Sequence, residues 1–574
     1  MPRNAVAGAE LLAAAYAQYR TRFAALTRRA AARFARADWA GGQRDAVERL
    51  ELYGEILDPA VKGLAELLGG DLASREAWGT LRAEYARAVE AFPDAPLAET
   101  FFNSASRHVL ATKGVDPLVE IRRAGSDPPR PPSPRDVARY ERKGSAGEEL
   151  LSRALAGSCL PWRDLRRDAS RAARALAADL VRAFGSADFD AMELVRSPFF
   201  RGKGAYLVGR VTRGRRIVPL VVAVVHDGAG AVVDAVLTEE DETSIVFSFT
   251  RAYFHVDAED PVGLVGFLKT IMPKKPVAEL YIALGLNKHG KSELWRDLAH
   301  HLATSSDLFV EAPGESGMVM AVFTLPSFDV VFKVIRDVFA APKTSSREEV
   351  REKYRLVFRH GRAGRLVDTQ EFTDLELPRA RFAAETLARL LALAPSSVRL
   401  DGERVLIKHL YTERRLVPLN LYLAHADEAA ACAAIVDYGQ ALRELAATNV
   451  FPGDLLLKNF GVTRHRRVVF YDYDELALLL DCNFRELPRA ATPDEETSAE
   501  PWFYVGENDV FPEELLPFLG LKRPLQEAFL EAHGELLTAR FWTSTQEKIR
   551  AGEILDVFPY PQARRLNAAG PAPR

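Results

Sequence analysis

Apolar side chains recur every three to four residues over the first part of the chain, which predicts an almost wholly helical structure up to about residue 121. The clearest stripe consists of Leu11, Leu12, Tyr16, Tyr19 and Phe23. Such a stripe is typical of the buried face of an amphipathic helix. The many alanines favour the same structure, because alanine loses the least entropy on entering a helix.

Proline-rich sequence over 127–134 interrupts this pattern, because proline lacks the N–H that a helix or a central strand needs. We expect a linker or an extended surface arm there, followed by a second helical block over about 147–184. Short β-branched and aromatic runs between Gly and Asp turns then predict an antiparallel meander near 203–250. Its expected strands are 205–211, 217–225, 231–237 and 244–249, and helices are expected again over about 261–303.

From Leu308 onward the pattern is strand, glycine turn, strand, helices, strand and then a mainly helical remainder. We therefore predict an α+β protein with a mainly helical first domain over 1–307, carrying the small antiparallel sheet, and a second domain over 308–574. The second domain is expected to have a small β-rich lobe over about 308–418 and a helical lobe over about 419–574. A cleft between two lobes is a natural place for a ligand.

Composition narrows the functional classes. The 574 residues carry 76 Lys+Arg against 79 Asp+Glu, a net charge of −3 that gives no general electrostatic drive toward nucleic acid. The three cysteines, Cys159, Cys432 and Cys482, are too few and too far apart for a disulfide framework and show no metal-ligand spacing. There is also no long uninterrupted apolar run, so we expect no membrane span and a cytoplasmic location.

One phosphate-binding motif lies in the first domain. The string from Gly285 to Ser292, with Gly290 and Lys291, matches a Walker A sequence, whose backbone N–H groups curl around phosphate oxygens. That motif needs a buried strand directly before it. The preceding apolar residues instead have helical spacing, so a helix–turn–helix is favoured and a P-loop NTPase remains the alternative.

A second candidate begins the second domain. The glycine-containing segment 312–318 is followed by expected strands over 319–323 and 328–334, with Lys333 inside the second. Kinases cover ATP phosphates with such a hairpin and pair such a lysine with the α- and β-phosphates. Its acidic partner is ambiguous, because Glu348, Glu349 and Glu352 all lie on the next expected helix. The segment itself consists of Ala312, Pro313, Gly314, Glu315, Ser316, Gly317 and Met318.

Downstream residues strengthen the kinase interpretation. Asp454 and Asn459 are five positions apart, as in the D-x-x-x-x-N of a kinase catalytic loop. Two short expected strands, 460–463 and 468–471, then form a hairpin that returns Asp472 beside Asn459, as two ligands of one Mg²⁺ site require. Asp472 and Asp474 face the same side of an extended chain, where two carboxylates ~4 Å apart repel by roughly 4 kcal/mol unless a cation or donors compensate.

The segment between these motifs fits an inter-lobe hinge. A strand is expected over 405–411, followed by the connection 412–418 and a helix that begins near Leu419. In a bilobal kinase the backbone of such a hinge receives adenine, although another core strand would give the same pattern.

With these parts in order, the sequence resembles the bacterial isocitrate dehydrogenase kinase/phosphatase family over nearly its full length. The shared segments are 101–104, 198–204, 272–276, 312–314, 451–454 and 471–474. The resemblance implies a helical regulatory domain that binds AMP, followed by a bilobal protein-kinase-like domain. It also implies a bifunctional enzyme that phosphorylates a serine of isocitrate dehydrogenase, inactivating it, and removes that phosphate again, thereby controlling flux between the citric acid cycle and the glyoxylate bypass.

Residue roles follow from the same resemblance. The ATP loop would be 312–318 with Lys333, and Asp454 would be the catalytic-loop aspartate. Asn459 and Asp472 would hold Mg²⁺, while Asp368 would be the active-site aspartate associated chiefly with the phosphatase reaction, in which ADP stays bound. The resemblance identifies no AMP contacts.

Departures from ordinary protein kinases leave other classes open. Phe451-Pro-Gly replaces the usual His-Arg before the catalytic aspartate, and Asp472-Tyr-Asp replaces Asp-Phe-Gly. The same loop resembles small-molecule phosphotransferases of the aminoglycoside-kinase type, and a nucleotide-binding scaffold without activity is the non-enzymatic option. A homodimer is compatible with the sequence.

Overall fold

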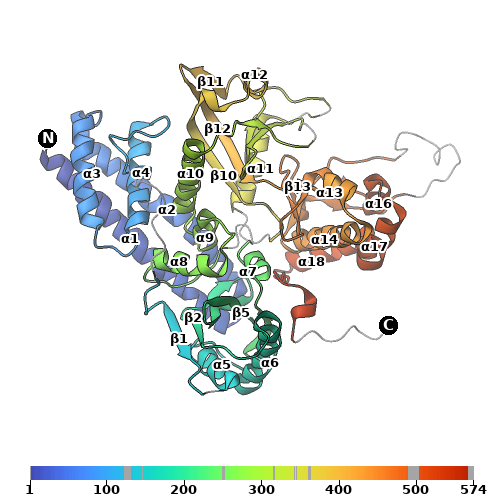
Figure 1. Cartoon of the computed structure of the whole chain (residues 1–574). Helices are drawn as coiled ribbons and strands as arrows, with labels where there is room; N and C mark the ends of the chain where they lie inside the picture. Colours follow the sequence, from blue (N-terminus) through green and yellow to red (C-terminus); the bar gives the residue numbers. More distant parts are fainter. Residues whose placement is uncertain are drawn as a thin grey trace. The chain divides into compact units, whose positions relative to one another are not determined.

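The computed structural model describes residues 2–121, 131–144, 146–248, 253–314, 317–341, 343, 345–359, 364–488 and 503–566 (Figure 1). The chain forms two compact units. Unit 1 comprises Met1–Ser306, Asp374–Leu377 and Phe558–Arg574, and unit 2 comprises Asp307–Thr373 and Pro378–Val557.

Unit 1 begins with four helices that confirm the helical interpretation of the first part of the chain. They are α1 (Pro2–Ala35), α2 (Trp39–Leu68), α3 (Arg75–Val89) and α4 (Ala95–Leu110). Leu12, Tyr16 and Tyr19 of the predicted stripe are buried and pack with Trp78 of α3 and Phe101 of α4 in one apolar core. The stripe on α1 is therefore the surface on which the other helices of this layer assemble.

An antiparallel sheet follows, in the strand order β1-β2-β4-β5-β6 with β3 paired to β4. Both of its faces are covered, because Val221 and Ala223 of β5 belong to the core of the N-terminal helices, whereas Val222 and Val224 belong to a second core with α5 (Gly147–Ala156) and α6 (Leu165–Phe184). The strands are β1 (Val137–Glu141), β2 (Ala191–Val195), β3 (Phe199–Arg201), β4 (Gly204–Arg213), β5 (Arg216–His226) and β6 (Ala231–Leu237).

Two details of the predicted meander are wrong. The expected strand over 244–249 is instead helix α7 (Glu240–Val246), which begins with three acidic residues that favour a helix N-terminus; residue 249 lies outside the described residues. Strands β1, β2 and β3 were also not anticipated, because each is only three to five residues long and lies outside the expected meander. Positions 127–130 of the expected linker also lie outside the described residues.

Three helices complete the first part of unit 1, as predicted for 261–303. They are α8 (Pro261–Ile271), α9 (Val277–Ala283) and α10 (Asn287–Thr304). Residues 558–566 also belong to this unit: the Arg565 guanidinium lies 2.9 Å from a carboxylate oxygen of Asp234 on β6, and the Tyr560 hydroxyl donates to the same carboxylate at 2.8 Å. The C-terminal segment therefore completes the sheet region of unit 1.

Unit 2 contains the β-rich lobe anticipated after Leu308. Its sheet has the order β10-β12-β9-β8-β7, with β11 paired to β12. Strands β8 and β9 form the predicted hairpin, and β12 pairs antiparallel with β9 so that Tyr411 lies opposite Lys333. The elements are β7 (Val310–Glu311), β8 (Met320–Leu325), β9 (Phe328–Ile335), α11 (Arg347–Arg359), β10 (Thr369–Pro378), α12 (Ala384–Leu393), β11 (Val398–Asp401) and β12 (Arg404–Arg414).

The remainder of unit 2 is mainly helical, so the α+β prediction is confirmed. Its core includes Tyr438, Phe460, Phe529 and Trp542. The principal elements are β13 (Val417–Pro418), α13 (Leu419–His425), α14 (Glu428–Ala447), β14 (Val450–Phe451), β15 (Phe460–Val462), β16 (Val468–Phe470), β17 (Ala477–Leu478), β18 (Asn483–Phe484), β19 (Asp509–Val510), α16 (Leu515–Leu519), α17 (Arg523–His533) and α18 (Ala539–Arg550).

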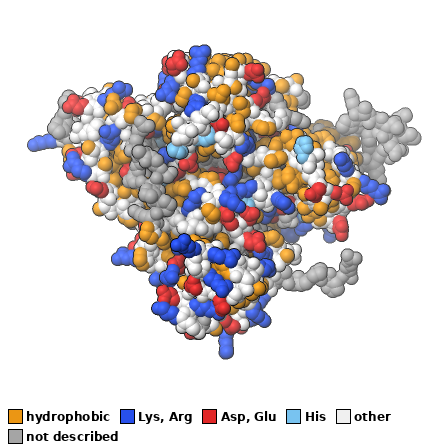
Figure 2. Space-filling model, in the orientation of Figure 1, with side chains coloured by type: hydrophobic (Ala, Val, Ile, Leu, Met, Phe, Trp, Pro, Cys, Tyr) orange, Lys and Arg blue, Asp and Glu red, His pale blue; other side chains and the backbone are white. Residues whose placement is uncertain are grey.

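The surface agrees with the near balance of charges in the sequence. On the face shown in Figure 2, basic and acidic side chains are intermingled over both units. Within the ranges that the structure describes, no helix combines the length and the apolar character needed to cross a bilayer.

Candidate active site

The Walker A string in unit 1 does not form a phosphate-binding loop, so the P-loop alternative is wrong. This motif needs a strand directly before it, but the chain forms helix α9 there. The next helix, α10, already begins at Asn287, which lies inside the string. The Gly290 N–H donates to the Leu286 carbonyl at 2.9 Å as part of the helix, so it cannot turn toward a phosphate. The predicted helix–turn–helix is confirmed.

The glycine segment of unit 2 lies between β7 and β8. The Ala312 N–H continues the pairing of these strands by donating to the Val322 carbonyl at 3.1 Å. Gly314 has a φ of +124°, a conformation that other residues rarely adopt, and this allows the chain to turn close to Pro418. Glu315 and Ser316 lie outside the described residues, and Gly317 and Met318 lead into β8.

Lys333 is the centre of a buried polar cluster. Its ammonium nitrogen lies 2.6 Å from a Glu413 carboxylate oxygen and donates to the Tyr471 carbonyl at 2.8 Å. The other Glu413 oxygen accepts a hydrogen bond from the Thr369 hydroxyl at 3.0 Å. Burial raises the pKa of Glu413, although Lys333 opposes the shift. The pair therefore holds the lysine in one orientation on the sheet.

The partner of Lys333, which the sequence left ambiguous among Glu348, Glu349 and Glu352, is Glu413. The first three glutamates lie on α11, where Glu348 and Glu352 pair with Arg355 and are more than half exposed. Glu413 was missed because it lies about 80 residues from Lys333 and meets it only through the antiparallel register of β9 and β12. The available signal was the alternation of β12, which places Glu413 on the same face as Tyr411.

The catalytic-loop candidates follow β14. Gly453, with a φ of +79°, approaches so closely that a Cβ there would lie 2.3 Å from the Glu475 carbonyl oxygen. This turn presents Asp454, whose carboxylate accepts from the Leu456 N–H at 3.0 Å. The Asn459 side-chain amide donates to the Asp454 carbonyl at 3.3 Å, so the two predicted residues of this motif are in direct contact. Burial raises the pKa of Asp454, and the Leu456 N–H opposes that shift.

The predicted β15–β16 hairpin is confirmed and returns the chain to Asn459. Phe460 pairs with Phe470, and the Tyr471 N–H donates to the Asn459 carbonyl at 3.1 Å, so that Asp472 follows directly. Burial and the neighbouring Asp474 carboxylate raise the pKa of Asp472, whereas Lys333 lowers it. The two aspartates are thus adjacent, as the alternation of an extended chain predicted.

Lys343 supplies a positive charge to these carboxylates. Its ammonium lies 3.2 Å from an Asp474 carboxylate oxygen and also pairs with Glu475. The same ammonium lowers the pKa of Asp472 and of Asp454, which indicates that all four acidic groups lie around it. Lys343 could not be identified from the sequence, because it lies outside the recognisable motifs.

Asp368 enters the region from a separate segment just before β10. Its carboxylate accepts from the Gln370 side-chain amide at 2.7 Å, and its charge raises the pKa of Glu413. Behind it, the buried Tyr473 hydroxyl donates to the Val367 carbonyl at 2.6 Å. Asp368 therefore lies on the Glu413 side of the cluster.

Within unit 2 the structure brings the predicted residues together. Lys333 interacts electrostatically with Asp472, Asp472 with Asp474, and Asp454 contacts Asn459. Among the described residues no three His, Cys, Asp or Glu side chains form a ready metal cage. The carboxylates of Asp472 and Asp474 and the side-chain amide oxygen of Asn459 are nevertheless oxygen ligands of the kind that Mg²⁺ takes. Substrate phosphates and water would complete its coordination shell. The arrangement can bind a phosphate chain and a divalent cation beside a carboxylate able to accept a proton.

Comparison with known proteins matches two family models to successive parts of the chain. Residues 307–562 match the kinase-domain model of isocitrate dehydrogenase kinase/phosphatase (AceK), and residues 9–306 match the regulatory-domain model of the same family. The chain is 52% identical over 565 residues to the isocitrate dehydrogenase kinase/phosphatase of Anaeromyxobacter sp. (strain Fw109-5), covering 98% of each chain. It is 51% identical over 578 residues to the protein of that name from Anaeromyxobacter dehalogenans (strain 2CP-C), again with 98% of each chain covered.

Proposed function

The chain belongs to the isocitrate dehydrogenase kinase/phosphatase family, and we propose that it catalyses both reactions in that name. It transfers phosphate from ATP to a serine of isocitrate dehydrogenase, which inactivates that enzyme, and it removes the phosphate again. The two activities control flux between the citric acid cycle and the glyoxylate bypass. The observation that carries this proposal is the match over 98% of the chain to relatives of that name.

For phosphorylation, Lys333 binds the α- and β-phosphates of ATP, held in place by Glu413 at 2.6 Å. The segment 312–318 covers the phosphates, as its position between β7 and β8 supports. Asp454 orients the serine hydroxyl and accepts its proton while the serine oxygen attacks the γ-phosphorus and ADP leaves. Its raised pKa favours proton uptake when the hydroxyl is deprotonated.

Asn459 and Asp472 are the residues that we propose for Mg²⁺. The adjacency of the Asp472 and Asp474 carboxylates, which raises the pKa of Asp472, supports this assignment, because two neighbouring negative charges are stabilised by a cation. When bound, the cation neutralises charge on the β- and γ-phosphates. In the structure Lys343 already supplies one positive charge to the same carboxylates.

For dephosphorylation, we propose that Asp368 activates the group that accepts the phosphate, either water or bound ADP. The acceptor oxygen bonds to phosphorus as the serine oxygen leaves, and that serine oxygen takes up a proton. The electrostatic interaction of Asp368 with Glu413, and of Glu413 with Lys333, supports a place beside the nucleotide phosphates.

Regulation and assembly stay predictions. AMP is expected to bind the regulatory domain, and no residue of unit 1 is assigned to it. A homodimer and a cytoplasmic location are likewise predictions; the three cysteines, which are free, support a reducing compartment.

A pulse-chase experiment tests the proposed function. The full-length protein is incubated with purified isocitrate dehydrogenase and labelled ATP, and unlabelled nucleotide is then added. Label should enter a serine of isocitrate dehydrogenase and then leave it, with isocitrate dehydrogenase activity falling and recovering in step. Labelling of a small molecule instead of the protein would favour the aminoglycoside-kinase type, and no labelling at all would favour the non-enzymatic scaffold.

A further inference from the structure

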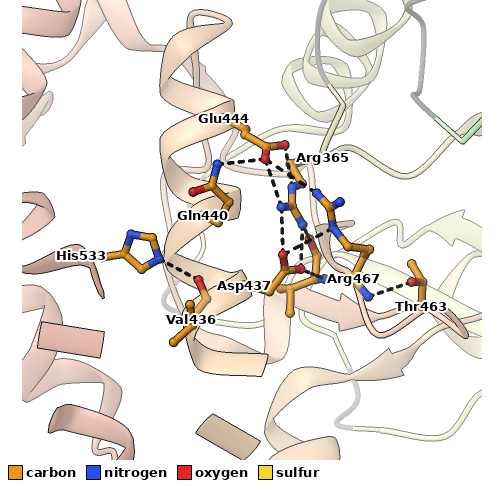
Figure 3. A network of polar contacts seen from close by, with 9 residues as sticks. Arg365, Val436, Asp437, Gln440, Glu444, Thr463, Arg467 and His533 are labelled. Carbon is orange, nitrogen blue, oxygen red and sulfur yellow. Dashed lines mark hydrogen bonds and ion pairs between the residues drawn. The ribbon is translucent and has the colours of Figure 1, made fainter. Parts of the chain in front are cut away.

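One of the most deeply buried large side chains of unit 2 is a charged one, that of Arg365, with 1% of its side-chain surface exposed (Figure 3). Its guanidinium makes two hydrogen bonds to the Asp437 carboxylate, at 2.7 and 2.9 Å, and two to the Glu444 carboxylate, at 2.8 and 3.1 Å. A further N–H donates to the Val468 carbonyl at 2.9 Å. These contacts use all five N–H donors of an arginine, so the side chain is fixed in one geometry.

Both carboxylates come from one face of α14, since residues seven positions apart lie two helical turns apart. Gln440 lies between them and donates to Glu444 at 3.1 Å (Figure 3). Arg467 adds a second positive charge at longer distances, 3.4 Å from Asp437 and 3.6 Å from Glu444. Burial alone would lower the pKa of Arg365, but Glu444 and Asp437 more than compensate and raise it, so the guanidinium stays charged.

The backbone around Arg365 links two chain segments that carry active-site candidates. The Phe470 N–H donates to the Arg365 carbonyl at 2.7 Å, and the Val367 N–H donates to the Phe470 carbonyl at 3.1 Å, forming a parallel bridge between Leu366 and Phe470. The side chain of Asp437 accepts from the Val468 N–H at 2.6 Å, so the same carboxylate holds both segments.

This bridge lies directly before two carboxylates of the site. Asp368 follows Arg365 by three residues, and Asp472 follows Phe470 by two. With both segments attached to one buried guanidinium, the separation between the two carboxylates depends on that guanidinium. By contrast, Lys333 is held by Glu413 on the sheet, and Asp454 is held by its own loop.

We propose that Arg365 is a positioning residue that fixes Asp368 relative to Asp472, and that dephosphorylation depends on this alignment more than phosphorylation does. The inference rests on the proposed role of Asp368 in dephosphorylation. The proposed phosphorylation mechanism uses Lys333, Asp454 and Asp472, and it does not use Asp368. Dephosphorylation needs both segments, and a displacement of ~1 Å can lower a rate by about 10²-fold.

The test compares Arg365→Lys with Arg467→Lys in the full-length protein. Lysine keeps the charge but has three donors in place of five, so at position 365 it cannot make two hydrogen bonds to each carboxylate and a further one to the Val468 carbonyl. Arg467→Lys changes a side chain that touches the same two carboxylates and is 19% exposed, and so it is the matched control. The measured quantities are kcat for phosphorylation of isocitrate dehydrogenase and kcat for release of phosphate from the phosphorylated protein, at saturating nucleotide.

For Arg365→Lys the ratio of dephosphorylation to phosphorylation should fall by about tenfold or more, whereas Arg467→Lys should change it by less than about twofold. A purely structural role would lower both rates by the same factor, and that result for Arg365→Lys overturns the proposal. An equal shift of the ratio in the control overturns it as well.

If Arg365→Lys does not fold, as judged by loss of a cooperative melting transition, Glu444→Gln replaces it. This change removes one of the two paired charges but keeps a hydrogen-bond acceptor, and the ratio should shift in the same direction; an equal loss of both rates contradicts the proposal. Asp368→Ala distinguishes a failure of the proposed role of Asp368 from a failure of the positioning role of Arg365. If it spares dephosphorylation, the proposed role of Asp368 fails; if it impairs dephosphorylation while the Arg365 variant leaves the ratio unchanged, only the positioning role fails.

Discussion

The ammonium nitrogen of Lys333 lies 2.6 Å from a carboxylate oxygen of Glu413, and the two side chains are 6% and 1% exposed. The two residues come from neighbouring strands, β9 and β12. The ammonium also donates a hydrogen bond to the carbonyl of Tyr471, which follows β16. A buried charge without a partner is costly. The glutamate therefore stabilises the lysine at this position and orients its ammonium toward the place proposed for phosphate.

Glu413→Gln should raise the KM for ATP by about tenfold, because the lysine loses the charge that orients it. Steady-state kinetics of phosphorylation with varied ATP measure this effect. Glu352→Gln is the matched control, since Glu352 lies on α11 with its side chain 58% exposed and should leave KM unchanged. If Glu352→Gln raised the KM more than Glu413→Gln, Glu352 on α11 would be the functional partner of Lys333 and the prediction would be wrong.

Lys333→Ala should weaken ATP binding strongly, whereas Lys291→Ala should leave it largely intact. The reason is that Lys333 lies among the acidic and backbone groups of the candidate site, while Lys291 lies on α10 in a string that forms a helix. Titration of the full-length protein with ATP, followed calorimetrically, measures both affinities. The opposite ranking would place the nucleotide in unit 1.

Asp454→Ala should lower kinase turnover by a factor of about 10² to 10⁴, the usual contribution of a positioned proton acceptor. Thermal unfolding should change little, because the carboxylate is half-exposed and its hydrogen bond to Leu456 is local. The exposed Asp481 provides the control, as Asp481→Ala should retain full turnover. Near-normal turnover of the Asp454 variant would remove this residue from the mechanism.

Local patterns were sufficient for much of the second domain. The β8–β9 hairpin, the position of Lys333 on it, the β15–β16 hairpin and the adjacency of Asp472 and Asp474 all depend on alternation and turns within about 20 residues. The sequence also indicated that a helix, and not a strand, precedes the Walker A string, because the spacing there has the helical period.

Long-range register could not be predicted in the same way. Glu413 meets Lys333 through strand pairing, and Arg365 meets α14 through packing, so neither contact leaves a local pattern. The misassigned strand at 244–249 shows a different limit: the residues are apolar enough for a strand, but the acidic residues before them start a helix. Charge near a helix terminus outweighed β-propensity there.

Asp368→Ala should impair dephosphorylation more than phosphorylation, because only the first reaction is proposed to use this carboxylate. We expect the dephosphorylation rate to fall by about 10² or more and the phosphorylation rate by less than about tenfold. Both rates are measured on the same preparation, with Asp374→Ala, further along β10, as the control. Equal losses would contradict a reaction-specific role.

Acid should weaken unit 2 through the carboxylate of Asp437. Burial by itself would raise the pKa of Asp437, but Arg365 and Arg467 outweigh it and hold the pKa below its ordinary value. The unfolded state therefore binds the proton more readily than the folded state. The stabilisation is fully present above the ordinary aspartate pKa of about 3.9 and is lost as the pH falls through the lower pKa of the folded protein.

Asp437→Asn tests this sign directly. At neutral pH the variant should lose about 3–5 kcal/mol of unfolding free energy, because Arg365 is left with one buried carboxylate partner fewer. Below about pH 4, however, the unfolding free energy of the variant should fall less steeply with pH than that of the unmodified protein, since the titrating group is gone. Urea denaturation at a series of pH values measures both quantities. Equal slopes in this acid range would show that Asp437 does not carry the proton linkage, and a steeper slope in the variant would show that its pKa is raised rather than lowered in the folded protein.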